Sequence, residues 1–108
     1  MQVRMQTQLL SRTPLEILYI CAMELFYVYV LVSEKDNSWY IGYTSDLAKR
    51  LIEHNSGKTI TTNRKKPWIV LYYEVSSNKE DAIAREKYLK SGMGRRYLKN
   101  RLKNQLDF

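Results

Sequence analysis

Glu86 is the residue whose type and position most strongly suggest chemistry. It lies in a predicted helix whose core-facing side is marked by Ala82, Ile83 and Leu89. At about 100° per residue its carboxylate falls inside this apolar stripe, where an ionised group is costly to bury unless a cation pairs with it. That cation could be Mg²⁺, which one carboxylate, several waters and substrate phosphate oxygens can hold together. Arg50 or a nearby lysine could instead form a structural ion pair, so both interpretations stay open.

Arg50 and His54 lie four residues apart on another predicted helix, at the border of its apolar stripe, and point toward the edge of the core. A guanidinium is always charged and can contact two phosphate oxygens at once, which makes Arg50 a candidate for binding a phosphodiester. His54 could bind phosphate or transfer a proton near neutral pH, although a lone histidine in such a place is more often structural. A single acid among so many basic residues argues against a two-metal nuclease.

A β-hairpin is predicted for residues 26–43, where two stretches rich in β-branched and aromatic residues flank a short polar link. If Ser33 opposes Ser38, then Tyr29 faces Gly42 across the strands. The glycine then leaves a gap beside the phenol. A register shift of one residue would undo this arrangement.

Tyr40 is expected on the same face of the hairpin as Tyr29. In this register it opposes Leu31 and lies about 7–8 Å diagonally from Tyr29. Aromatic residues in strands ordinarily belong to a core. A phenol has a pKa near 10, so it acts as a general base only with help from cationic neighbours or a metal-bound water. The two tyrosines are therefore candidates for either role.

Basic residues are concentrated in two stretches of a chain whose net charge is +7. Residues 44–66 contain six Lys or Arg and two acids, and residues 85–103 contain eight and Glu86 alone. Such an excess attracts a polyanion, and the attraction weakens as salt rises, so nucleic acid is the expected partner, with a solvated surface as the alternative. The candidate nucleic-acid contacts are Lys49, Arg64, Lys65, Lys66, Lys90, Arg95 and Arg96.

The elements that must position these residues follow the order β-β-α-β-α-α. The predicted strands span residues 26–32, 39–43 and 68–75, and the predicted helices span 47 to about 55, the stretch between 78 and 91, and 95 to about 105. N-cap residue types at Thr44-Ser45-Asp46 and Ser77-Asn78 start the first two helices. Residues 58–66 predict a loop, and residues 91–94 predict a break between the last two helices.

Residues 1–23 show no clean period and are expected to be an appendage to a domain that spans residues 24–108. A translation start at Met23 would leave residues 1–22 outside the native protein. Cys21 is the only cysteine, which excludes an internal disulfide or a cysteine zinc site and favours a reducing compartment, the cytoplasm. No apolar run reaches the roughly 20 residues that span a bilayer, so no membrane partner is expected. No small-molecule cofactor is expected either.

Five elements in order resemble the GIY-YIG nuclease superfamily, over about residues 26–98. They are Tyr27-Val28-Tyr29, Tyr40-Ile41-Gly42, Arg50, His54 and Glu86 within Ala84-Arg85-Glu86-Lys87. The likeness is greatest to the short single-domain bacterial members, which are similar to the N-terminal nuclease domain of the excision-repair endonuclease.

The resemblance implies an α/β (α+β) fold, with a small three-stranded antiparallel sheet flanked by helices. It implies a metal-dependent endonuclease that hydrolyses DNA, with repair or branched structures as candidate substrates. In that family Glu86 would hold one divalent metal, Mg²⁺ or Mn²⁺, Arg50 would contact the phosphate, and Tyr29 or Tyr40 would help to deprotonate the attacking water. His54 is a further catalytic candidate. The alternative is a catalytically silent nucleic-acid-binding module.

The chain departs from the family pattern at a few positions. Tyr27 stands where the name-giving triplet has glycine, and Tyr43 stands where some members have a lysine. The role of that lysine is either vacant or filled by Lys49 or Lys90. Asn100 matches only loosely an asparagine that many members carry after the glutamate. Larger relatives attach separate DNA-binding domains, so the specificity of this chain is expected to be low or to come from a protein partner.

Overall fold

The computed structural model describes residues 13–16, 18 and 23–105 of the 108-residue chain. Its elements are β1 (Phe26–Ser33), β2 (Trp39–Thr44), α3 (Leu47–Asn55), α4 (Ile60–Asn63), β3 (Trp68–Ser76), α5 (Lys79–Lys90) and α6 (Gly92–Arg101). The predicted order is confirmed, with one short helix, α4, added inside the predicted loop. The predicted N-terminal appendage falls largely outside the described residues. No helix in the described part of the chain is long and apolar enough to cross a membrane.

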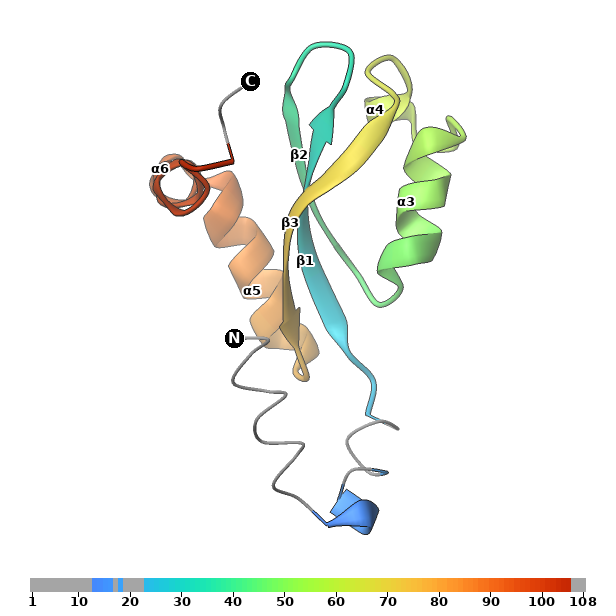
Figure 1. Cartoon of the computed structure of the whole chain (residues 1–108), viewed down its shortest axis with the longest axis vertical. Coiled ribbons are helices and arrows are strands. Elements are labelled where there is room, and N and C mark those ends of the chain that lie inside the picture. The colour runs from blue at the N-terminus through green and yellow to red at the C-terminus, as the bar shows by residue number, and fades with distance from the viewer. Residues whose placement is uncertain (1–12, 17, 19–22, 106–108) are drawn as a thin grey trace.

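The three strands form one antiparallel sheet in the order β2-β1-β3, which makes β1 the central strand. Helix α3 covers one face of the sheet and α5, with α6 beside it, covers the other (Figure 1). Because β1 is covered on both faces, seven of its eight residues are buried, and its sequence is an almost continuous apolar run. The predicted fold, a three-stranded antiparallel sheet flanked by helices, is confirmed.

Two separate cores lie on the two faces of the sheet. The core under α5 and α6 consists of Phe26, Val28, Val30, Ile41, Ala82, Leu89, Leu98 and Leu102. The core under α3 consists of Tyr29, Leu31 and Trp68, with Tyr40, Leu47, Leu51 and Val70 packed against them. Alternate residues of β1 enter the two cores because successive side chains of a strand point to opposite faces. Both candidate tyrosines therefore belong to the α3 side.

The predicted hairpin register is confirmed. Tyr29 pairs with Gly42 and Leu31 pairs with Tyr40, and the Ser33 amide donates to the Ser38 carbonyl at 2.8 Å. The ring centroids of the two tyrosines lie 6.3 Å apart on one face of the sheet.

Two apolar residues of α3 and α5 are exposed, and one of them, Ile83, was predicted to face the core. Ile52 on α3 is 67% exposed and Ile83 on α5 is 43% exposed. Their helical periodicity is real, but each helix packs against the sheet along a narrower stripe than the pattern predicts. On α5 the stripe runs through Ala82 and Leu89, which are 1% and 0% exposed. The inward assignment of Ile83 was therefore wrong.

The break between the last two helices is a single residue, which corrects the predicted break over residues 91–94. The Ser91 hydroxyl donates to the Tyr88 carbonyl at 2.6 Å, and its oxygen accepts from the Gly94 amide at 3.1 Å. Ser91 therefore caps the end of α5 and the start of α6. A Cβ at Gly94 would overlap the Tyr88 carbonyl, so the glycine allows the two helices to meet this closely.

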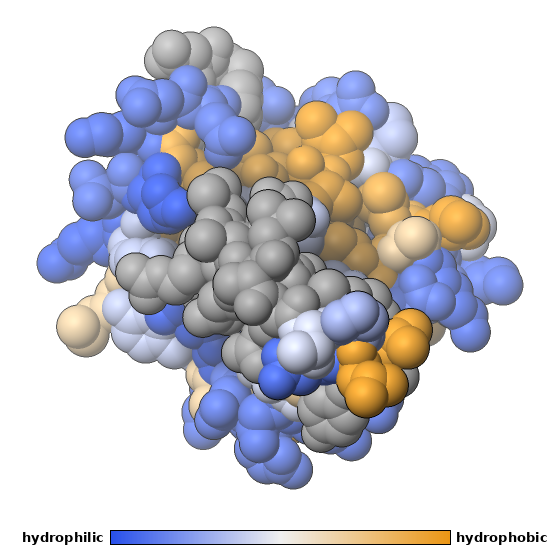
Figure 2. All heavy atoms as spheres, turned by 60° about the horizontal axis from the view of Figure 1, so that its bottom comes forward, coloured by the Kyte–Doolittle hydropathy of each residue, from blue (hydrophilic) through white to orange (hydrophobic). Residues whose placement is uncertain are grey.

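An open groove of about 490 Å³ lies between α3 and the strands β1 and β3. Its apolar lining comes from Tyr27, Leu47, Leu51, Val70 and Tyr73. Figure 2 brings the bottom of Figure 1 forward and shows hydrophobic side chains gathered toward the α3 side, whereas the α5 and α6 side is mainly hydrophilic. The two sides of the sheet thus present surfaces of different character.

Candidate active site

The Tyr29 phenol lies across the edge strand β2. Gly42 stands directly opposite Tyr29 in the register, and a Cβ on this glycine would lie 2.5 Å from the Tyr29 Cζ and overlap its hydroxyl. The ring therefore occupies the space that a side chain at position 42 would take, as the predicted gap implied. This crossing carries the hydroxyl from the central strand toward the β2 edge of the sheet.

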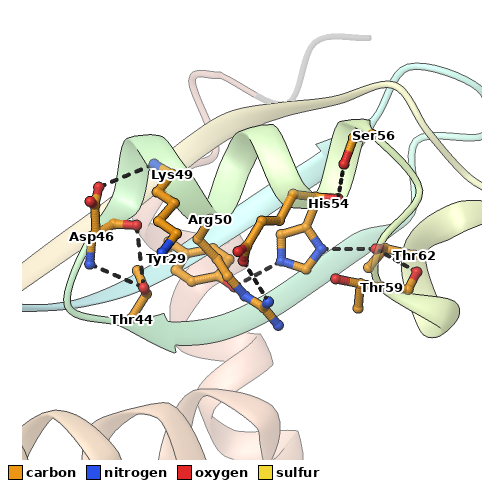
Figure 3. Close-up of polar contacts among 10 residues, drawn as sticks. Tyr29, Thr44, Asp46, Lys49, Arg50, His54, Ser56, Thr59 and Thr62 are labelled. Carbon is orange, nitrogen blue, oxygen red and sulfur yellow. Dashed lines mark hydrogen bonds and ion pairs between the residues drawn. The ribbon is translucent and has the colours of Figure 1, made fainter.

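The Tyr29 hydroxyl contacts the imidazole of His54 in the interior of the domain. Its side chain is 0% exposed, which is deeper than the predicted border of the helix stripe. The Tyr29 hydroxyl lies 2.9 Å from its Nε2, and the Thr62 Oγ1 lies 2.8 Å from its Nδ1 (Figure 3). The Thr62 hydroxyl in turn donates to the Thr59 carbonyl at 3.4 Å.

These contacts assign directions to the hydrogen bonds. Because the Thr62 hydroxyl donates its hydrogen bond to the Thr59 carbonyl, its oxygen accepts from Nδ1 of His54. Nε2 of His54 then has no proton and accepts from the Tyr29 phenol. Burial lowers the pKa of His54 below its usual 6.5, with the Arg50 charge acting in the same direction and the Glu53 charge opposing it. The imidazole is therefore neutral at pH 7 and has a lone pair directed at Tyr29.

Aromatic rings and the segment after α3 hold His54 in place. The Tyr40 ring meets the imidazole edge to face at 4.8 Å between centroids, and Tyr40 in turn packs on Trp68. The indole of Trp68 donates to the Thr62 carbonyl at 2.9 Å, which anchors α4. Sequence reasoning missed Thr62, because a lone threonine within a basic stretch carries no signal of burial.

The Arg50 guanidinium lies beside the Tyr29 hydroxyl, and its side chain is 33% exposed, at the border of the helix stripe as predicted. Its Nη1 donates to Glu53 at 3.1 Å, so its ion-pair partner is not Glu86. Burial raises the pKa of Tyr29 to about 12, although the neighbouring Arg50 acts to lower it, while the charges of Tyr40 and Glu86 add to the rise. The phenol is thus fully protonated at neutral pH.

Glu86 is partly exposed, which corrects the prediction of a buried carboxylate. Its side chain is 21% exposed and forms an ion pair with Lys90 at 3.1 Å, one turn later on α5. The nearby lysine, and not Arg50, is therefore its cation in this structure. Its charge adds to the rise in the pKa of Tyr29, although the Tyr29 side chain packs on the α3 face of the sheet and α5 covers the other face.

The donor set around Glu86 is compatible with Mg²⁺ or Mn²⁺. Within residues 13–16, 18 and 23–105 no group of three or more His, Cys, Asp or Glu side chains could enclose a metal. A lone, partly exposed carboxylate matches the way Mg²⁺ is commonly bound, because this ion keeps several waters and takes further oxygens from a phosphate. Lys90 would compete with the metal for the same carboxylate.

Comparison with known proteins identifies the family. The model of the GIY-YIG catalytic domain matches residues 25–103, which include all five candidate catalytic residues.

The chain belongs to the GIY-YIG catalytic domain family.

Relatives of this GIY-YIG domain include UPF0213 proteins of several bacteria. UPF0213 protein YazA of Bacillus subtilis is 46% identical over 66 residues, which cover 60% of this chain and 64% of the relative, just under two thirds of its length. A UPF0213 protein of Staphylococcus haemolyticus is 41% identical over 66 residues, covering 60% of this chain and 79% of that protein. The solution NMR structure of a UPF0213 protein from Bacillus halodurans is 34% identical, covers 68% of this chain and 81% of its own, and has a TM-score of 0.44.

The predicted nucleic-acid contacts of the GIY-YIG domain lie at separate places on its surface. Lys65 forms an ion pair with Asp36 at 3.5 Å, which puts the exposed group Arg64, Lys65 and Lys66 near the β1–β2 turn. Lys49 is exposed on α3, Lys90 on α5, and Arg95 and Arg96 on α6. The structure thus gathers Tyr29, Tyr40, Arg50 and His54 into one cluster, with Glu86 nearby. Of the predicted basic contacts, Lys49 adjoins Arg50 and Lys90 pairs with Glu86, whereas the others lie on α6 and in the segment before β3.

The departures from the GIY-YIG pattern have structural explanations. Tyr43 stacks on Phe26 at 6.2 Å in the core under α5, on the sheet face opposite Tyr29, so it takes no part in the cluster. Tyr27 packs on Tyr73 at 6.2 Å and lines the groove. Asn100 is exposed on α6.

Proposed function

We propose that this GIY-YIG domain is a metal-dependent endonuclease that hydrolyses phosphodiester bonds of DNA. The observation that carries the proposal is the contact of the Tyr29 hydroxyl with Nε2 of His54, directly beside Arg50. It joins a group that can relay a proton, a neutral acceptor for that proton and a permanent positive charge for a phosphate. These are the requirements of water attack on a phosphodiester.

Tyr29 would act together with His54 and not as a free phenolate. Its pKa of about 12 keeps the phenol protonated at neutral pH, so the phenolate form is scarce. The phenol oxygen can take a proton from the attacking water while its own proton passes to Nε2 of His54. The imidazolium that results keeps its Nδ1 bond to Thr62. The acceptor at the end of this relay is thus an imidazole that is neutral at pH 7.

Arg50 would hold the phosphate. Only its Nη1 contacts Glu53, which leaves other N–H donors of the guanidinium for two phosphate oxygens. The Arg50–Glu53 pair is about a third exposed on both sides, so solvent weakens it and a phosphate can compete for the guanidinium. Positive charge fixed at this place stabilises the charge that grows on the phosphate in the transition state.

Glu86 would bind Mg²⁺ or Mn²⁺. When bound, the divalent ion supplies Lewis-acid stabilisation of phosphate charge and a lowered pKa for water. The Glu86 carboxylate must first give up part of its contact with Lys90, which is 52% exposed and can swing into solvent. The same ion pair is the one observation that favours the rival function, a silent DNA-binding module in which Glu86 is only a structural partner.

DNA is the proposed substrate because the basic residues behind the net charge of +7 are concentrated in residues 44–66 and 85–103. Repair intermediates and branched DNA are the structures to test first, with specificity supplied in part by a protein partner. The single cysteine of the chain favours the cytoplasm as the place of action.

Replacing Glu86 tests the proposal. The Glu86→Gln protein should bind DNA but should not cut a panel of duplex, flap, junction and single-stranded DNAs in Mg²⁺ or Mn²⁺. Its free energy of unfolding should change by no more than about 0.5 kcal/mol, because an ion pair between residues four apart on a helix contributes little. Glu80→Gln, at an exposed position of the same helix, is the matched control and should cut normally.

Two outcomes would contradict the proposal. A Glu86→Gln protein that cuts at the wild-type rate would remove Glu86 from the mechanism. A wild-type protein that binds the whole panel and cuts none of it, with either metal, would leave the silent binding module as the function.

A further inference from the structure

Two exposed tyrosines, one on α5 and one on α6, are not part of the candidate active site. Tyr88 is 38% exposed and Tyr97 is 36% exposed. The Arg85 guanidinium lies over both rings, 5.3 Å from the centroid of Tyr88 and 4.9 Å from that of Tyr97. We call Tyr88 and Tyr97, with Arg85 between them, the tyrosine pair.

An ion pair with Glu74 holds the Arg85 guanidinium of the tyrosine pair in place. Nε and Nη2 of Arg85 donate to the two carboxylate oxygens of Glu74 at 2.9 and 3.0 Å, and the Glu74 side chain is only 15% exposed. The Tyr72 hydroxyl donates to the same carboxylate at 3.0 Å. A bidentate pair of this kind fixes the plane of the guanidinium, so both rings are oriented before any ligand arrives.

The surroundings of the tyrosine pair are basic. Arg95, Arg96, Lys99 and Arg101 are all exposed on α6, and the surface on this side is mainly hydrophilic in Figure 2. An apolar protein partner would be better matched by the groove beside α3. Exposed aromatic rings among basic residues are instead typical of sites that bind nucleic acid with the bases stacked on the rings.

We propose that the tyrosine pair stacks unpaired bases of a nucleic-acid strand. A fully paired duplex hides the faces of its bases, so only a single-stranded segment can use such a surface. Adjacent residues of a helix point about 100° apart, so Arg85, which pairs with Glu74 on β3, and Glu86, which pairs with Lys90, lie on different sides of α5. The inference rests on the proposed function, and it narrows the substrate to DNA that carries an unpaired segment.

Binding in EDTA tests the tyrosine pair without any cleavage. The full chain is titrated with a fluorescent oligothymidine of about a dozen nucleotides and with a blunt duplex of the same length. The double variant Tyr88→Leu/Tyr97→Leu should lose at least about tenfold in affinity for the single strand and little for the duplex. The control Tyr88→Phe/Tyr97→Phe keeps the rings and should bind both as the wild type does. An equal loss on both ligands, or no loss on the single strand, would overturn the inference.

A second measurement needs no variant, in case the leucine protein fails to fold. Wild-type protein is irradiated with an oligonucleotide that carries 5-iodouracil, which crosslinks to aromatic rings stacked on it, and the adducts are located by mass spectrometry. Adducts on Tyr88 or Tyr97 support the stacking surface, and adducts confined to other residues overturn it. Because neither measurement involves cleavage, a protein that stacks bases here but cuts nothing would refute the endonuclease alone.

Discussion

The Tyr29 hydroxyl lies 2.9 Å from Nε2 of His54, a histidine that is completely shielded from solvent. One partner stands on the central strand and the other near the end of α3, 25 residues later in the chain. Each therefore satisfies a polar group of the other that burial would otherwise leave without a partner. The stability of the domain and the proposed activity should therefore both respond to changes at this contact.

Burial of His54 should make the protein less stable in mild acid. The pKa of His54 is below 6.5 in the folded chain, mainly because burial disfavours its charged form. Between that pKa and 6.5 the unfolded chain binds a proton that the folded chain does not, so stability present above pH 6.5 is lost as the pH falls through this window. Denaturant unfolding of the wild type at several pH values from about 7.5 to 5 measures this loss.

The variant His54→Gln provides the comparison for this measurement. Glutamine can hydrogen-bond but does not titrate, so its unfolding should show less dependence on pH in the same window. Asp36 does not interfere, because hydrogen bonds from Ser38 hold the pKa of that carboxyl at about 2, well below the window. If the variant lost stability with pH as steeply as the wild type, His54 would not be the group that titrates.

Gly42→Ala should disturb the Tyr29 phenol. The new methyl group would overlap the ring, so Tyr29 or the β2 backbone must move, at a cost of about 1–3 kcal/mol in the free energy of unfolding. The hydroxyl would leave its contact with His54, and cleavage should fall with it. Urea unfolding and a cleavage assay measure the two effects.

Gly92→Ala is the matched control, because no atom lies within 4 Å of the position that its Cβ would take. Alanine is a better helix former than glycine, so this variant should be as stable as the wild type or slightly more stable. Equal stability of the two alanine variants would mean that the sheet yields easily at Gly42 and that the tight fit of Tyr29 is unimportant.

The hairpin could be predicted from the sequence because its geometry is local. A short polar link between two apolar strands fixes the register, and the register alone places Tyr29 against Gly42. The helix caps at Asp46 and Asn78 were predictable for the same reason, since each involves an amide three residues later.

The surroundings of His54 and Glu86 could not be predicted in this way. The depth of His54 depends on Thr62 and Trp68, which come from later segments that fold back over α3. The exposure of Glu86 depends on where α5 crosses the sheet, because the helix packs along Ala82 and Leu89 and leaves the neighbouring turn accessible. Periodicity gives the side of a helix that faces inward, but tertiary packing sets how deep each residue lies.

Lys90→Gln should make Glu86 a better metal ligand. Removing the ammonium group 3.1 Å from the carboxylate removes a competitor for the divalent ion. The Mg²⁺ concentration that gives half-maximal cleavage should therefore fall by about twofold, since a partly exposed pair of this spacing is weak. Because Lys90 is also a candidate DNA contact, the titration is done at saturating DNA. Lys87→Gln on the same helix should leave the metal requirement unchanged, and a rise in the requirement for the Lys90 variant would argue against a metal on Glu86.

The basic group Arg64, Lys65 and Lys66 should contribute to the salt dependence of DNA binding. Each phosphate contact contributes about −0.9 to the slope of log K against log salt, so the triple glutamine variant should have a flatter slope by as much as about 2.7. Its melting temperature should change little, because all three side chains are exposed. Arg95→Gln/Arg96→Gln tests the α6 side in the same assay. If the triple variant kept the wild-type slope, the DNA would contact another face.

Ser91 leaves no linker between α5 and α6, and Gly94 lies against the end of α5, so the angle between the two helices has little freedom to change. The carboxylate on α5 and the basic side chains on α6 are therefore parts of one rigid arm. A strand anchored along α6 would meet Glu86 at a distance set by the protein and not by the flexibility of a hinge. In the proposed endonuclease, this fixed distance would determine the cleavage position. The cut should fall a constant number of nucleotides from the anchored segment, whatever its sequence.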